Sequence, residues 1–136
     1  MKIKLLVELA PLTIFIVAVL LKLLNVPGLS LVIFFDGLLL MTIYMFLSFW
    51  LFDDPTILTV YKILIGLVYM FTIFVSIFFL FNGYGFLLLV GVGYTFLLFH
   101  FLICLFKIKT RFYQQHFFRS LLLLIVLTLI YVHHYH

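Results

Sequence analysis

A lysine and an aspartate stand inside one of the most apolar stretches of the sequence, LLKLLNVPGLSLVIFFDGLLL at positions 20–40. Lys22 precedes an Asn-Val-Pro-Gly turn, and Asp36 follows it. A lone charge at the centre of a bilayer costs about 2.5–3.5 kcal/mol. Two opposite charges in such a stretch are therefore expected to pair, and a buried pair of this kind is a candidate for a proton path.

The geometry of a helical hairpin favours this pair. If the residues on either side of the turn form antiparallel helices, the depths of Lys22 and Asp36 differ by about 6 Å. Each side chain tilts toward the N-terminus of its own helix, so the two charged groups lean toward one another. Two alternatives stay open. Lys22 can extend to the headgroups while Asp36 is kept neutral or is capped by Ser30 or Thr42, or the charges can contact a separate partner chain.

Two further ionisable residues, Glu8 and His100, are candidates for a proton path. Glu8 follows Lys4 by one helical turn, so a surface ion pair between them is the alternative interpretation. His100 lies about two turns before Lys107, and a neutral, hydrogen-bonded interior histidine would need no function.

The sequence contains no pattern typical of an enzyme or a metal site. It has no nucleophile with a neighbouring base and no glycine-rich phosphate loop, and its single cysteine, Cys104, excludes an intrachain disulfide and a thiolate metal site. The terminal HHYH at 133–136 has no acid or thiolate beside it, so it is more typical of an interfacial anchor than of a coordination shell. We expect a non-enzymatic protein with no cofactor and no metal.

Composition places the chain in a membrane. Of the 136 residues, 68% are hydrophobic and 9% are charged, whereas ordinary globular chains are about half apolar and a quarter charged. The isoelectric point near 9.3 does not indicate nucleic-acid binding, because the basic residues lie at the ends of apolar runs and form no basic patch. We expect one transmembrane domain over 1–136, with the lipid bilayer as its main contact.

Turn-forming residues divide the chain into about five predicted transmembrane helices. The breaks fall at 25–28, 53–56, 82–85 and 107–116, and the predicted spans are 4–24, 29–52, 57–81, 85–106 and 117–132. Asp53 and Asp54 are predicted to cap the third helix. The last span is short, so it needs Arg119 to extend to the headgroups or the bilayer to thin locally, or it lies in the interface.

The sequence also contains a candidate internal repeat. LLNVPGLSLVI at 23–33 aligns with LFNGYGFLLLV at 80–90. Each segment contains a predicted turn between two apolar helices. The turn residues are Asn25, Pro27 and Gly28 in the first segment, and Asn82, Gly83 and Gly85 in the second. The fold class that this predicts is all-α, a polytopic membrane bundle of two tandem helical hairpins followed by one C-terminal helix. The alternative is that any tight turn attracts Asn and Gly.

The basic residues predict the orientation. With the N-terminus in the cytoplasm, seven of the eight Lys and Arg residues fall on the inner side and only Lys22 falls outside, which agrees with the positive-inside rule. We therefore expect a bacterial inner-membrane protein with a periplasmic C-terminus.

The stretch LLKLLNVPGLSLVIFFDG resembles the first hairpin of GldL, the membrane subunit of the Bacteroidota gliding and type 9 secretion motor. Related Bacteroidota proteins read F-K-[IL]-x-H-x-P-G before a second apolar helix. Lys22, Pro27 and Gly28 fall on this pattern, and Asn25 stands where it has histidine. In GldL, a lysine and a glutamate inside the membrane are tied to proton-driven rotation, so the resemblance implies such a role for Lys22. Asp36 would be the acid, although it lies closer to the turn than the glutamate of that family, whose members have two spans and a cytoplasmic extension.

Together these features predict a non-enzymatic subunit of a larger inner-membrane complex, such as an ion-driven motor or secretion assembly, with Lys22 and Asp36 as its functional core. Other membrane protein subunits are the expected partners. A small transporter or channel that works alone or as a homo-oligomer is one alternative. An accessory subunit of a respiratory-type complex is another.

Overall fold

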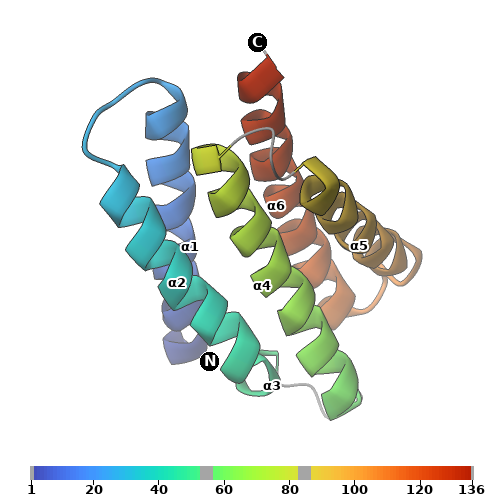
Figure 1. Ribbon diagram of the computed structural model, residues 1–136. Helices are drawn as coiled ribbons and strands as arrows, with labels where there is room; N and C mark the ends of the chain where they lie inside the picture. The colour runs from blue at the N-terminus through green and yellow to red at the C-terminus, as the bar shows by residue number, and fades with distance from the viewer. Residues whose placement is uncertain (1, 53–56, 83–86, 136) are drawn as a thin grey trace.

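The computed structural model describes residues 2–52, 57–82 and 87–135, and these residues form helices without strands. The helices are α1 (Lys2–Leu23), α2 (Ser30–Phe46), α3 (Ser48–Leu51), α4 (Thr59–Asn82), α5 (Leu87–Phe106) and α6 (Arg111–Tyr135) (Figure 1). The all-α prediction is therefore confirmed. Within the described residues, α1, α4, α5 and α6 each contain a stretch long and apolar enough to cross a membrane.

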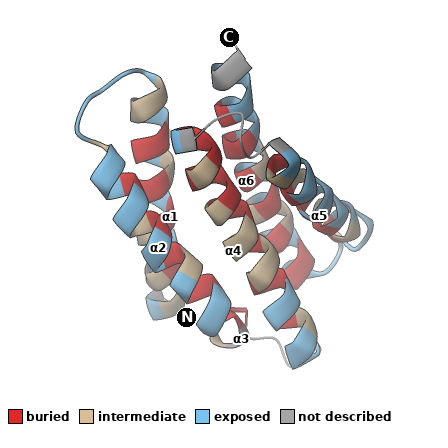
Figure 2. Cartoon of the chain, in the orientation of Figure 1, coloured by how far each residue is buried: buried red, intermediate tan, exposed pale blue. Residues whose placement is uncertain are grey.

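Helix α4 lies at the centre of the bundle. It packs against α2 and α3 on one side and against α5 and α6 on the other, while α1 packs against α2 (Figure 1). Its apolar stretch is 56% buried, compared with 33% or less in α1, α5 and α6. The buried surfaces of the helices face one another around α4, and their outward surfaces are exposed (Figure 2).

The turn between α1 and α2 is formed as predicted. The N–H of Val26 donates to the carbonyl of Leu21, and the N–H of Asn25 donates to that of Lys22. These two bonds close α1 in a Schellman motif, which requires a left-handed residue directly after the helix. Asn25 supplies it with a φ of 67°, and Gly28 has a φ of 82°. Both are residue types that tolerate positive φ.

The second predicted span is interrupted, so its prediction as one helix over 29–52 is wrong. α2 ends at Phe46, Leu47 leaves the helical region with φ −112° and ψ 8°, and α3 follows as a single turn. Close packing against α4 accounts for the break. A Cβ on Gly66 would collide with the backbone carbonyl of Tyr44 and with the Ser48 side chain. The absence of a side chain at position 66 therefore lets the α2–α3 junction lie directly on α4.

The last helix is longer than predicted. α6 begins at Arg111, inside the predicted break over 107–116, so the second part of that break is helical. Instead of the predicted span over 117–132, the structure has a helix of 25 residues. The first two turns of α6 continue the buried face of the later turns. The buried residues on this face are Phe112, Tyr113, His116, Ser120, Leu123 and Leu127. Contact of this face with α4 and α5 outweighs the polarity of Gln114 and Gln115, which are exposed.

Three predictions fall on residues whose placement is not described. The cap formed by Asp53 and Asp54 lies outside the described residues, as do Gly83 and Gly85 of the second turn. Asn82 is the last residue of α4.

One end of the bundle carries most of its positive charge. α1 and α4 begin there, and α5 and α6 are joined there (Figure 1). This end, which we call the basic end, bears Lys4, Lys62, Lys107, Lys109 and Arg111. The opposite end holds the turn between α1 and α2, with Lys22 in the last turn of α1.

Candidate functional site

A buried ion pair joins the first helix to the last. Nε of Arg119 in α6 donates to both carboxylate oxygens of Glu8 in α1, at 2.8 and 2.9 Å, and Nη2 donates to Oε1 at 2.6 Å. The side chain of Glu8 is 1% exposed and that of Arg119 is 16% exposed. Glu8 therefore lies in the interior, which rules out the alternative of a surface pair with Lys4, and Arg119 is directed toward Glu8 instead of extending to the headgroups. The packing of α6 against α1 puts both charges in the interior at the same depth.

A tyrosine from a third helix completes this contact. The hydroxyl of Tyr44 in α2 donates to Oε2 of Glu8 at 2.8 Å, and both residues are buried. Charge-assisted hydrogen bonds of this kind are shorter and stronger than neutral ones. Glu8 therefore connects α1, α2 and α6.

A second hydrogen-bonded group lies beside the first. The hydroxyl of Tyr69 in α4 is 3.0 Å from Nε2 of His100 in α5 and 2.6 Å from Nδ1 of His116 in α6. A hydroxyl can donate only one hydrogen bond, so at least one of the two imidazoles must donate its N–H to Tyr69. His100 is thus an interior, hydrogen-bonded histidine.

Ring contacts connect the two groups. The rings of Tyr44 and Tyr69 have centroids 5.3 Å apart, and the ring of Phe52 lies 4.5 Å from that of His116. The guanidinium carbon of Arg119 is 5.1 Å from the centre of the Phe52 ring. We call the set of hydrogen-bonding residues the polar cluster. Its members are Glu8, Tyr44, Tyr69, His100, His116 and Arg119.

The polar cluster draws on α1, α2, α4, α5 and α6, in the half of the bundle toward the basic end. Among the described residues, no group of three or more His, Cys, Asp or Glu side chains could hold a metal ion. The arrangement can exchange protons between neighbouring hydroxyl, imidazole and carboxylate groups. Its most direct physical effect is to hold five helices in one register, because separating any of them would leave buried polar groups without partners.

The sequence contained a signal for part of this cluster. Glu8 is the one acidic residue in α1, and Arg119 is a charged residue among the apolar residues of α6. Both lie a few residues from the basic end, and charges inside membrane helices usually pair with one another. Tyr44 and Tyr69 carried no comparable signal, because nothing distinguishes them from the other six of the eight tyrosines in the sequence.

Lys22 does not pair with Asp36 in the described residues. Its Nζ donates to the hydroxyl of Ser30 at 3.1 Å and lies 5.1 Å from the centre of the Phe81 ring. The predicted pair is wrong because a nearer acceptor, at the first residue of α2, and an aromatic face on α4 take up the ammonium group.

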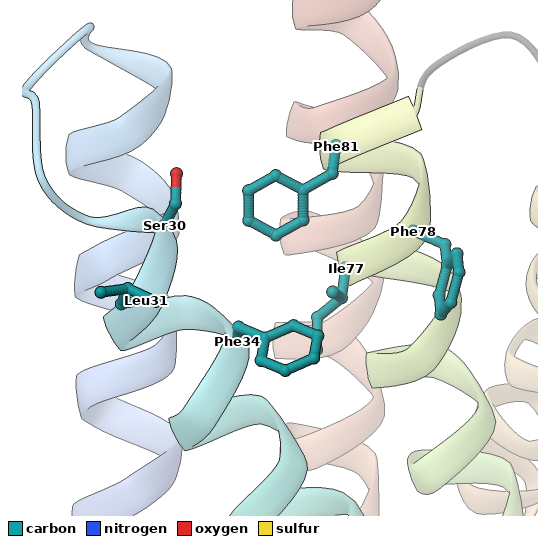
Figure 3. A pocket seen from close by; sticks show the side chains of 6 residues that line it. All are labelled: Ser30, Leu31, Phe34, Ile77, Phe78 and Phe81. Carbon is teal, nitrogen blue, oxygen red and sulfur yellow. The ribbon is translucent and has the colours of Figure 1, made fainter.

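The residues around Lys22 border a cavity of about 370 Å³ between α2 and α4. Phe34 of α2 and Ile77 and Phe81 of α4 face one another across it, and Ser30 lies at its upper edge (Figure 3). Lys22 is therefore held at the rim of an apolar cavity, away from the polar cluster.

Asp36 is left without a partner on its buried side. It is partly buried, and its oxygen Oδ2 has no hydrogen-bond partner among the described residues. The two predicted caps are engaged elsewhere: the hydroxyl of Thr42 donates to the carbonyl of Leu38, and that of Ser30 accepts from Lys22. Neither residue hydrogen-bonds Asp36 in the structure.

Comparison with known proteins adds no relative: no family model, curated protein or solved structure matches the chain.

Proposed function

We propose that this chain is a non-enzymatic integral membrane protein that works as a subunit of a larger membrane complex, and that Asp36 is the point at which it contacts a neighbouring subunit. The observation that carries this proposal is the buried carboxylate oxygen of Asp36, which has no partner among the described residues and belongs to the one charged side chain of α2. Glu8, the other acid among the described residues, has its partners within the chain, in the polar cluster.

Asp36 lies well inside α2. It is six residues beyond Ser30, the first residue of the helix, which corresponds to about 9 Å along the helix axis. Intramembrane acids almost always pair with another polar group or line a water-filled path, because an isolated one is costly in hydrocarbon. Since the described part of the chain supplies no donor to Oδ2, we infer that the donor belongs to another subunit.

The surroundings of Asp36 favour a contact from outside. Ile33 and Leu40, on one side of it along the helix, are buried, whereas Val32 and Leu39, on the other side, are 42% and 51% exposed. Asp36 therefore lies on the border between the core of the bundle and its outer surface. A cationic or hydrogen-bonding side chain of a neighbouring helix can bind the carboxylate there when the carboxylate turns so that its buried oxygen faces the outer surface.

We further propose how the protein lies in its membrane. α2 and α3 together cross the membrane once, which with the four longer helices makes five crossings. The chain then forms two hairpins, α1–α2 and α4–α5, followed by α6. The basic end faces the cytoplasm of a bacterial inner membrane, because positively charged residues favour that side.

The kind of complex is suggested by the first hairpin. Its resemblance to GldL favours an ion-driven motor or secretion assembly, and in that setting Asp36 would act on a partner group and not on Lys22. An accessory role in a respiratory-type complex fits the same contact of Asp36 with a neighbouring subunit.

A stand-alone transporter has less support. Thr72 and Ser76, in the half of α4 beyond the polar cluster, bond to carbonyls of their own helix and so do not offer their hydroxyls to a transported ion. Proton flux into liposomes containing only this chain, abolished by Asp36→Asn, would identify a transporter.

Sizing in a mild detergent tests the proposal. The wild-type chain, extracted from its native membrane, should elute in a complex far larger than 16.0 kDa. Asp36→Ala should release it, because truncating one partner of a buried charged contact costs about 2–5 kcal/mol of binding. Thr42→Ala is the matched control, since Thr42 is in the same helix but bonds to its own backbone. A wild-type monomer, or equal elution of the two variants, would overturn the proposal.

A further inference from the structure

Two cavities lie end to end between α4 and α5. The one nearer the basic end has a volume of about 690 Å³ and is lined by Lys107, Thr110 and Tyr113 among others. The second, of about 550 Å³, continues along α4 and α5 as far as Phe71. Tyr61 and Ile103 line both cavities, so the two adjoin along α4 and α5, and we call them together the groove. Both volumes fall within the range of about 300–1,000 Å³ typical of small-molecule sites.

The chemistry of the groove changes along its length. At the basic end, the ammonium group of Lys107 lies 5.3 Å from the centre of the Tyr113 ring, which holds a positive charge at the mouth. Farther along, the lining is almost wholly apolar, with Leu64, Val68 and Phe99 as examples. A groove that is cationic at one end and apolar at the other matches a molecule with an anionic head and a hydrocarbon tail.

An unsatisfied hydroxyl lies where the two parts meet. The hydroxyl of Tyr61 is buried beside Tyr113, and it makes no hydrogen bond of good geometry among the described residues. Buried polar groups without a partner are rare, and each calls for an explanation. A ligand oxygen at the junction of head and tail, such as an ester carbonyl, would accept a hydrogen bond from Tyr61 once the hydroxyl turns from Tyr113 toward the groove.

We propose that this groove binds one anionic phospholipid. Its phosphate lies at Lys107, its glycerol ester accepts a hydrogen bond from Tyr61, and one acyl chain runs between α4 and α5 toward Phe71. The neighbouring Lys109 and Arg111 are exposed, and they attract anionic headgroups to this end of the bundle without lining the groove. The site is independent of Asp36, which is on α2.

Native mass spectrometry of the full chain in detergent, with added phosphatidylglycerol or phosphatidylcholine, tests the site. Phosphatidylglycerol should bind as a single copy, and it should bind more tightly than phosphatidylcholine. Lys107→Gln should raise the Kd for phosphatidylglycerol about fivefold, the loss expected for one basic residue near a membrane surface. Lys109→Gln is the matched control, because it removes the same charge from an exposed residue beside the groove.

Tyr61→Phe and inorganic phosphate separate the two parts of the ligand. Removing the hydroxyl should weaken phosphatidylglycerol binding while the chain keeps its thermal stability. Inorganic phosphate should not compete, because the acyl chain supplies much of the affinity. Equal binding of the two lipids, equal loss in the Lys107 and Lys109 variants, or competition by inorganic phosphate would each overturn the proposal. None of these results bears on the sizing experiment with Asp36.

Discussion

Glu8 and Arg119 stand near opposite ends of the chain and form a bidentate ion pair in the interior of the bundle, with N–O distances of 2.6, 2.8 and 2.9 Å. The pair fixes α6 against α1, although neither helix is the other's main packing partner. Its position beside Tyr44 and Tyr69 makes it the centre of the polar cluster.

Removing one member of this pair should destabilise the protein more than removing both. Glu8→Leu or Arg119→Leu alone leaves a buried charge without a partner, which costs about 3–5 kcal/mol, whereas an apolar replacement of a whole buried pair is often close to neutral. The free energy of unfolding in detergent micelles measures this. Arg111→Leu, an exposed arginine in the same helix, is the control and should change stability by about 0.5 kcal/mol or less. A double variant as unstable as the sum of the two single variants would contradict the account.

Gly66 should not tolerate even a methyl group. Gly66→Ala places a carbon against the carbonyl of Tyr44 and the side chain of Ser48, and overpacking of this kind costs about 1–3 kcal/mol. Gly91 in α5 is the matched control, because a Cβ there meets nothing within 4 Å. Gly91→Ala should stabilise the helix by up to about 1 kcal/mol. Thermal unfolding of the two variants gives the comparison, and equal melting temperatures would show that α2 does not lie as close to α4 as described.

The sequence alone predicted most of the helices but not their side-chain partners. Apolar runs bounded by turn residues predicted α1 and the turn at Asn25 and Gly28, because backbone groups in lipid must bond internally. The predicted break over 107–116 hid the start of α6, because the deciding contacts of Phe112 and His116 are with other helices.

The candidate site was predicted only in part, for a related reason. Lys22 and Asp36 are close in sequence, and their similar depths in the predicted hairpin made a pair between them plausible. The nearer hydroxyl of Ser30 and the ring of Phe81 decide the position of Lys22, and Phe81 lies on a helix whose placement the sequence does not give. Pairs such as Glu8 and Arg119, separated by 111 positions, depend on the packing of the whole bundle.

Lys22 and Asp36 should behave independently when both are changed. Because Lys22 bonds to Ser30 and not to Asp36, the effects of Lys22→Gln and Asp36→Asn on the free energy of unfolding should add within about 0.3–0.5 kcal/mol. An ion pair would instead make Asp36→Asn alone more harmful than the double variant. A coupling energy well above about 0.5 kcal/mol would show that Lys22 and Asp36 interact directly, which contradicts the structure.

Whether Asp36 reaches a second protein is measured most directly by photo-crosslinking from a neighbouring residue that leaves its carboxylate intact. A photoreactive amino acid at Leu39, which is exposed one turn from Asp36, should form a covalent adduct with one protein in native membranes, and Asp36→Ala should abolish that adduct. The same group at the exposed Leu98 of α5 should not give this adduct. An adduct that persists without the carboxylate, or no protein adduct at Leu39, would contradict the assignment of this acid to a subunit contact.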